Sequence, residues 1–148
     1  MYGGDRVEPI HVTIDRVAAG HEDAVRRVVR ECATRLHPVA VRVNAVFGLP
    51  SKYRGAVVKL DVPRDPEIDR AIAAVKTALR AAGAPSLYGP ERWAAVTALE
   101  RVDRAASDTA EPLATPVELF GGDSLILSRI AGPSRYEILE SARMVGSG

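Results

Sequence analysis

The sequence predicts one α+β domain with a mixed, mainly antiparallel sheet and helices on its outer faces. Three observations indicate this fold class. Apolar and polar residues alternate over 10–14, 39–47 and 56–62, which is the period of half-buried strands. Two other segments, 21–36 and 65–82, repeat apolar residues at the helical spacing of three and four. The last third of the chain has short apolar segments separated by glycine-containing turns, a pattern typical of antiparallel hairpins.

The first predicted strand, PIHVTIDRV at 9–17, places two polar side chains on one face. Its alternating apolar positions are Ile10, Val12 and Ile14. Successive side chains of a strand point to opposite faces, so His11 and Thr13 share the other face. The helix over 21–36 follows, and Pro38 ends it.

The rest of the chain continues the same organisation. Asp65, Pro66 and Glu67 form a typical helix start, with a capping residue, a proline in the first turn and an early acid. A strand is predicted over 93–102 and a polar loop over 103–116. The closing antiparallel strands are predicted at VELF, DSLILSRI and RYEILESA, followed by a frayed tail over 143–148.

The amino-acid composition limits which classes of protein and of binding partner are expected. The chain has 148 residues, 47% hydrophobic and 26% charged, as expected for a single globular domain over 1–148. Lys and Arg number 20 against 19 Asp and Glu, so no strong field attracts polynucleotides or anionic membranes, and a small partner is expected. The single cysteine, Cys32, and the lack of a secretory signal predict a cytoplasmic protein. No apolar run of about 18 residues is present, so we expect no membrane span.

A degenerate internal repeat links the two predicted strands. HVTIDRV at 11–17 recurs as AVTALERV at 95–102. Two His-x-Thr strands related by a pseudo-twofold would direct two imidazoles and two hydroxyls into one cleft. Here the second copy keeps Thr97 but has Ala95 in place of the histidine.

That set of groups suits phosphodiester chemistry. An imidazole with an ordinary pKa of about 6.5 acts as base or acid at neutral pH, and threonine hydroxyls donate hydrogen bonds to phosphate oxygens. The scheme needs no metal, and the sequence has no clustered metal ligands, phosphate loop or dinucleotide motif. We therefore expect neither metal nor cofactor.

The order of these elements resembles the two-histidine phosphoesterase superfamily, which includes 2′,5′ RNA ligase-like proteins and cyclic phosphodiesterases. The resemblance extends over about 9–142 and lies in HVT, LHPVAVRVNAVFGLPS, AVVKLDV, WAAVT, SLILSR and RYEIL. It implies a bilobal fold and a metal-free cleft acting on cyclic phosphates, 2′,5′-linkages or small cyclic nucleotides. The implied catalytic positions are His11, Thr13, Thr97 and Ala95, and the implied partner is a small nucleotide or RNA end.

Two departures from the family pattern affect the expected function. Ala95 stands where the family has its second catalytic histidine, which predicts weak or no turnover; the alternative is a non-catalytic nucleotide-binding module, and a third is a partner-binding domain without a ligand. Ala95 is an inherited loss, a deliberate substitution, or an ordinary core alanine in a misaligned strand. The segment before His11 is also short, so the first lobe has an open sheet edge, and a homodimer is one way to cover it.

The aromatic residues supply candidates for nucleobase contacts. Trp93, Tyr53 and Tyr136 are the predicted substrate-binding residues, since aromatic faces stack on bases. Trp93 lies two residues before Ala95 and so shares its face in a strand. Tyr88 is a further aromatic candidate. The alternative for each is ordinary packing against the sheet.

Overall fold

The computed structural model describes residues 5–51, 55–89, 94–132 and 135–145. Within these ranges the chain forms seven strands, two α-helices and one short 3-10 helix. In chain order the elements are β1 (Asp5–Arg6), α1 (Glu22–Ala33), β2 (Val39–Pro50), β3 (Ala56–Asp61), α2 (Pro66–Ala81), β4 (Ala95–Val102), η1 (Arg104–Ala106), β5 (Thr109–Gly122), β6 (Ser124–Gly132) and β7 (Arg135–Arg143).

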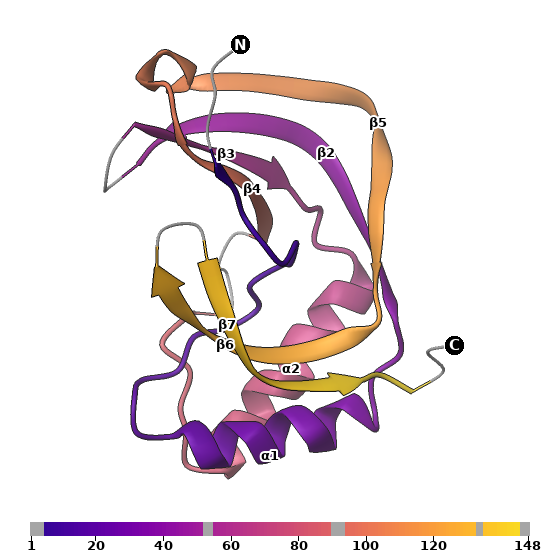
Figure 1. The fold of residues 1–148 in the computed structure, drawn as a ribbon. Helices are drawn as coiled ribbons and strands as arrows, with labels where there is room; N and C mark the ends of the chain where they lie inside the picture. Colours follow the sequence, from indigo (N-terminus) through magenta and orange to yellow (C-terminus); the bar gives the residue numbers. More distant parts are fainter. Residues whose placement is uncertain (1–4, 52–54, 90–93, 133–134, 146–148) are drawn as a thin grey trace.

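Two sheets organise the chain (Figure 1). The larger has the strand order β1-β4-β3-β2-β5, and the smaller is the β6-β7 hairpin. Every strand pair in both sheets is antiparallel. The long strands β2 and β5 bend together and descend toward the helices, where β5 leads into β6. The predicted α+β class with a mainly antiparallel sheet is confirmed.

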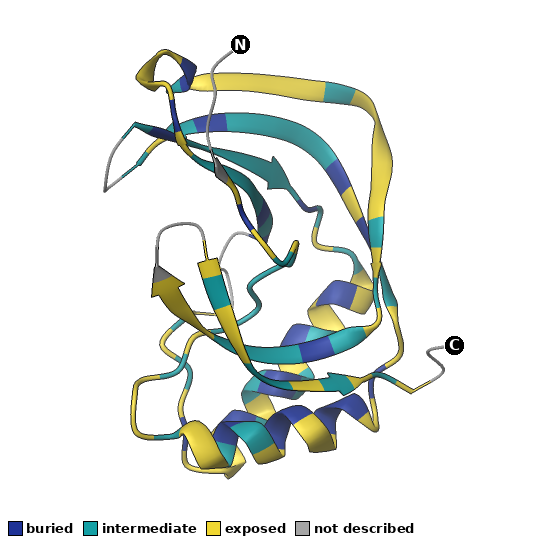
Figure 2. Cartoon of the chain, in the orientation of Figure 1, coloured by how far each residue is buried: buried dark blue, intermediate teal, exposed yellow. Residues whose placement is uncertain are grey.

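The helix α2 joins two clusters of buried side chains, visible in Figure 2 as dark segments of the helices and strands. One cluster packs α1 and the later turns of α2 against β6, with Val28, Leu79 and Leu125 among its members. The other packs the first turns of α2 against β2 and β4; its members include Ile72 and Val96. The apolar stripes predicted from the sequence are the faces that enter these clusters.

The start of α2 follows from its local sequence. The side chain of Asp65 accepts a hydrogen bond from the backbone N–H of Ile68 at 2.9 Å, and Pro66 occupies the first turn. An aspartate at this position satisfies an N–H that has no partner within the helix. The cap therefore fixes where α2 begins, as its sequence predicts.

The predicted loop over 103–116 is wrong in its second half. From Thr109 onward the chain is strand β5, which pairs with β2 from Gly48 to Val39. Most of β5 is exposed, and its register against β2 shifts twice. A strand at the edge of a sheet tolerates prolines and needs no alternating pattern, so pairing with β2 decided its conformation and composition did not.

The predicted first strand over 9–17 also differs from the structure. It makes only isolated bridges, Val12 with Val96 and Val17 with Ser86. The reason is a mismatch of register with β4: Arg6 lies opposite Leu99, whereas Val12 lies opposite Val96. Between these two pairs, the N-terminal segment therefore has more residues than β4. The extra residues interrupt the regular pairing of the two segments.

The chain is held in place as far as Val145. Strand β7 continues to Arg143, and the backbone N–H of Met144 donates to the carbonyl of Asp123 at 2.8 Å. The N–H of Val145 donates to the carbonyls of Ala33 and Leu36. Tertiary hydrogen bonds to the end of α1 thus order residues 143–145, which the sequence places in the frayed tail.

Burial raises the pKa of the Cys32 thiol on the inner face of α1. The unfolded chain then ionises at lower pH than the folded one, so this residue's contribution to stability is complete below a pH of about 9 and declines as the pH rises above it. We expect the free energy of unfolding in urea to fall more steeply above a pH of about 9 in the unmodified protein than in Cys32→Ala. Equal slopes would contradict this expectation.

Candidate functional site

The candidate site lies where the segment 11–13 meets β4. Val12 and Val96 form an antiparallel bridge. Residues on either side of such a bridge lie opposite each other, so His11 is placed beside Thr97 and Thr13 beside Ala95. Val12 and Val96 are also the equivalent central residues of the two repeat copies. Antiparallel pairing of equivalent residues is what a local pseudo-twofold axis produces.

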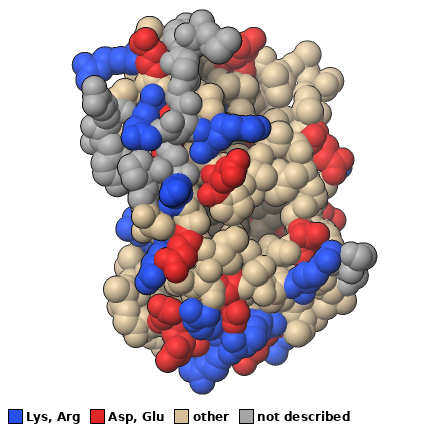
Figure 3. Space-filling model, viewed as in Figure 1, with Lys and Arg blue, Asp and Glu red and all other residues tan. Residues whose placement is uncertain are grey.

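The two sides of this pairing face different environments. Val96 is fully buried, and Val12 and Leu60 pack against the same cluster. Alternation therefore turns His11, Thr13, Ala95 and Thr97 to the opposite face, where all four are half-buried. The molecule is recessed between its upper sheet and its lower half in the view of Figure 3. The four predicted catalytic positions are thus neighbours on one partly accessible face.

The imidazole of His11 is held from two sides. Its Nδ1 lies 2.6 Å from the carbonyl oxygen of Pro9. A carbonyl only accepts hydrogen bonds, so Nδ1 carries the proton and Nε2 of the neutral ring is the atom with a lone pair. The Tyr136 ring contacts the imidazole edge-on, with the centroids 4.7 Å apart and the planes at 74°. The ring therefore has a fixed orientation, with the lone pair on Nε2.

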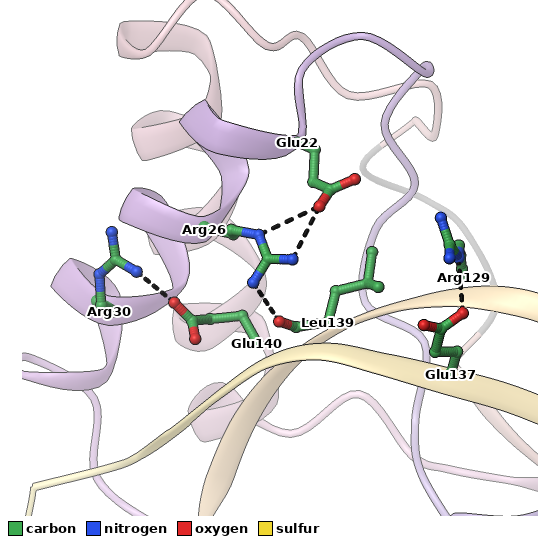
Figure 4. A network of polar contacts seen from close by, with 7 residues as sticks. All are labelled: Glu22, Arg26, Arg30, Arg129, Glu137, Leu139 and Glu140. Carbon is green, nitrogen blue, oxygen red and sulfur yellow. Dashed lines mark hydrogen bonds and ion pairs between the residues drawn. The ribbon is translucent and has the colours of Figure 1, made fainter.

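Arginines of α1 hold the β6-β7 hairpin that delivers Tyr136 (Figure 4). Arg26 pairs with Glu22 at 2.8 Å and donates to the carbonyl of Leu139 in β7, and Arg30 pairs with Glu140. The hydrogen bond from Arg26 to Glu22 raises the pKa of Arg26, so this guanidinium stays charged. The hairpin, and Tyr136 with it, is in this way fixed to the helix.

The predicted contact residues have different outcomes. Tyr136 meets His11, as described. Trp93 and Tyr53 lie outside the described residues. The backbone carbonyl of Tyr88 accepts a hydrogen bond from Lys76, so the main chain of this residue has a structural role.

Two charged residues of β3 adjoin the site and were not predicted. Lys59 pairs across the strands with Thr97, and Asp61 with Ala95. Directly opposed residues share a face, so both charges are on the side of His11. The alternation of AVVKLDV gives them a face away from Leu60, but only the strand register shows which neighbours they have.

A buried polar network anchors the same segment two residues beyond Thr13. Asp15, with 5% of its side chain exposed, pairs with Lys76 of α2 at 3.2 Å and accepts a hydrogen bond from Ser86. Lys76 also donates to the hydroxyl of Ser86 and the carbonyl of Tyr88, both at 2.8 Å. The network therefore ties the segment after Thr13 to α2 and to the loop that leads toward β4.

A small hollow lies beside this network. Its lining residues are Thr13, Ile14, Arg64, Ile72, Lys76, Gly89 and Ala94. Arg64 and Lys76 are each paired with a carboxylate, of Asp69 and Asp15 respectively. The hollow therefore has two cations whose charges are already balanced.

Two kinds of feature are absent from the described residues, 5–51, 55–89, 94–132 and 135–145. No helix among these residues is long and apolar enough to cross a membrane. In the same part of the chain, no three His, Cys, Asp or Glu side chains gather as a metal site would require.

Comparison with solved structures identifies the class of fold. The Escherichia coli LigT complexed with 3′-AMP matches with a TM-score of 0.58 and 16% identity, over 96% of this chain and 82% of LigT. TT0787 of Thermus thermophilus matches with a TM-score of 0.60 and 15% identity, over 99% and 85%. A phosphoesterase structure matches with a TM-score of 0.54 and 14% identity, over 95% and 81%.

The chain therefore has the fold of the two-histidine phosphoesterases, as the resemblance in its sequence implies. At these identities the likeness extends to the fold alone. No family model and no curated protein sequence matches the chain.

Proposed function

We propose that this protein is a phosphodiesterase-type protein that uses His11, Thr13 and Thr97 on cyclic phosphates, 2′,5′-linkages or small cyclic nucleotides. The observation that supports this most is the Val12–Val96 bridge, because it makes neighbours of His11 and Thr97 on one side and of Thr13 and Ala95 on the other. A phosphate between these residues would accept hydrogen bonds from both hydroxyls.

The proposed reaction uses Nε2 of His11 as the base. The imidazole removes a proton from water, the water oxygen bonds to phosphorus, and the bond from phosphorus to the leaving oxygen breaks. That oxygen needs a proton, and Ala95 cannot give one, so bulk water must supply it. General acid catalysis contributes about 10²–10⁴-fold, so turnover by this chain is slow or absent.

A small nucleotide is the proposed partner. LigT has been crystallised with 3′-AMP and with NADP+, both of which join a nucleoside to phosphate. Tyr136 lies against the imidazole and is the proposed contact for the base or sugar. Trp93 and Tyr53 are proposed as further contacts.

Ala95 favours a second candidate function, a nucleotide-binding module without catalysis. Both candidate functions require binding of a nucleotide, but only the enzyme converts it to a product. Stabilisation of the unmodified protein by nucleotides without formation of product from 2′,3′-cyclic AMP would favour the binding module. Slow formation of product would favour the enzyme.

Binding through His11 tests the proposal directly. We expect 3′-AMP at about a hundredfold excess over its dissociation constant to stabilise the folded protein by about 2.7 kcal/mol. His11→Ala should bind about tenfold more weakly or worse, because it removes the imidazole, which donates a hydrogen bond from Nε2 to the charged phosphate when both ring nitrogens carry protons. Titration calorimetry and thermal unfolding measure both effects.

His37→Ala is the matched control, since His37 is exposed beyond the end of α1. It should bind 3′-AMP as the unmodified protein does. If the unmodified protein binds neither 3′-AMP nor 2′,3′-cyclic AMP, or if His11→Ala binds as tightly, the proposed function is wrong.

A further inference from the structure

We infer that Ile130 and Ile138 of the β6-β7 hairpin, together with Tyr136, form an apolar platform for the base of a nucleotide and make the site favour purines. The phosphate stays between the two threonines of the proposed site, and the base extends past His11 onto the hairpin. This inference rests on the proposed function and adds its specificity-determining residues.

The pairing of the hairpin puts the three side chains of the apolar platform on one face. Ile130 lies directly opposite Tyr136. Directly opposed residues share a face and have Cβ atoms about 4.5–5.5 Å apart. Ile138 follows Tyr136 by two residues on β7, so it is on that face too, roughly 6.4–6.8 Å further along. The Tyr136 ring lies 4.7 Å from the imidazole of His11, centroid to centroid, so the apolar platform is continuous with the proposed phosphate site.

Both isoleucines of the apolar platform are exposed. Ile130 is 63% exposed and Ile138 is 49% exposed. Nearer the start of β6, Leu125 and Leu127 of the same hairpin pack against the cluster that includes α1. Large apolar side chains that are exposed beside one another are typical of a binding surface. Covering them with an apolar group of a ligand removes them from water and so contributes to binding.

The charged neighbours of the apolar platform lie on the other face of the hairpin. Arg129 precedes Ile130, and Glu137 separates Tyr136 from Ile138, so alternation turns both charges away, and they pair with each other at 2.8 Å (Figure 4). Contact with the base therefore depends on apolar area and not on ionic attraction. Such a surface contacts the flat face of any base without reading its hydrogen-bonding edge, so the larger purines should bind more tightly than pyrimidines.

The size of the apolar platform favours a base over a second copy of the protein. Each partner in a stable protein interface buries about 800 Å². A large aromatic side chain buries only about 150–250 Å², and the three side chains here are already partly covered, so together they fall well short of that area. A base needs no more than such a face, and its phosphate is held beside it.

Titration calorimetry with different bases tests the apolar platform. The unmodified protein should bind 3′-AMP and 3′-GMP alike and 3′-UMP about threefold more weakly. Ile130→Thr and Ile138→Thr keep a β-branched side chain but lose apolar surface, so they should bind 3′-AMP about fivefold more weakly and lose the preference for purines. Ile138→Trp should bind more tightly, because an indole stacks on the base. Val117→Thr, at a valine of β5 that is 51% exposed, is the control and should bind as the unmodified protein does.

Two results would overturn this inference and leave the proposed function standing. One is His11-dependent binding of 3′-AMP that is equally tight in the unmodified protein, Ile130→Thr and Ile138→Thr. The other is a dimer of the unmodified protein, seen by light scattering, that Ile138→Thr dissociates, because a second copy would then cover the apolar platform. If the protein binds 2′,3′-cyclic AMP but not 3′-AMP, the same comparison uses 2′,3′-cyclic AMP and 2′,3′-cyclic UMP. If it binds neither, both the inference and the proposed function are overturned.

Discussion

Replacing Ala95 with histidine should make the protein hydrolyse 2′,3′-cyclic AMP about 10²–10⁴-fold faster than the unmodified chain. The new imidazole would stand beside Thr13, across the Val12–Val96 bridge from His11. It would supply the proton that the leaving oxygen lacks. Asp61, which lies beside position 95 on β3, would accept a hydrogen bond from the new ring and help to fix its tautomer. Product formation followed by chromatography measures the rate.

Two variants separate acid catalysis from a change in binding. Ala95→Asn introduces a polar side chain that cannot transfer a proton at neutral pH, and it should remain as slow as the unmodified protein. Ala95→His combined with His11→Ala should lose the gained activity. A folded Ala95→His protein that binds 3′-AMP but gains no activity would refute the shared role of positions 11 and 95.

Lys76→Met should lower the free energy of unfolding by about 3–5 kcal/mol, because it leaves the carboxylate of Asp15 buried without its cation. Lys76 and Asp15 have only 15% and 5% of their side chains exposed, and Lys76 also holds Ser86 and the carbonyl of Tyr88. The substitution therefore removes the contacts that join α2 to the segment after Thr13 and to the loop that leads toward β4. Urea unfolding monitored by circular dichroism measures it.

The double variant Asp15→Asn with Lys76→Met tests the cause. It removes the buried charge along with its partner, so it should be more stable than Lys76→Met alone. Arg30→Met is a surface control: it removes the ion pair with Glu140, but Arg30 is 57% exposed, so the loss should be about 1 kcal/mol or less. Similar losses in Lys76→Met and Arg30→Met would show that the buried network does not stabilise the fold.

The helices and the paired strands β3, β4, β6 and β7 follow closely from sequence patterns, because each has a regular apolar period and a clear start or end. The start of α2 at Pro66 is the sharpest case, since the cap by Asp65 is a local interaction. The first half of strand β5 was not predicted, and the reason is equally physical. Its conformation comes from hydrogen bonds to β2, which lies far earlier in the chain, and no local pattern encodes them.

In the candidate site, too, some features follow from the sequence and others depend on the tertiary structure. The repeat of HVT as AVT identified His11, Thr13, Ala95 and Thr97 from the sequence, since equivalent halves of a pseudo-twofold keep their pattern. The positions of Lys59 and Asp61 beside them could not be predicted, because a strand's alternation gives the face of a charge but not its cross-strand neighbour. The same holds for Arg26 and Arg30, whose spacing on α1 suggests a solvated face but which contact β7.

The sequence by itself determined the α+β class, the approximate limits of both helices and the four residues at the repeat, because periodicity and capping act over a few neighbouring residues. Only the tertiary structure decided that Val12 pairs with Val96, that Tyr136 meets His11, and that two charges of β3 join them. Strand register and the approach of a distant hairpin depend on packing between segments far apart in the chain. For this protein, that packing brings the two copies of a degenerate repeat together on one partly accessible face.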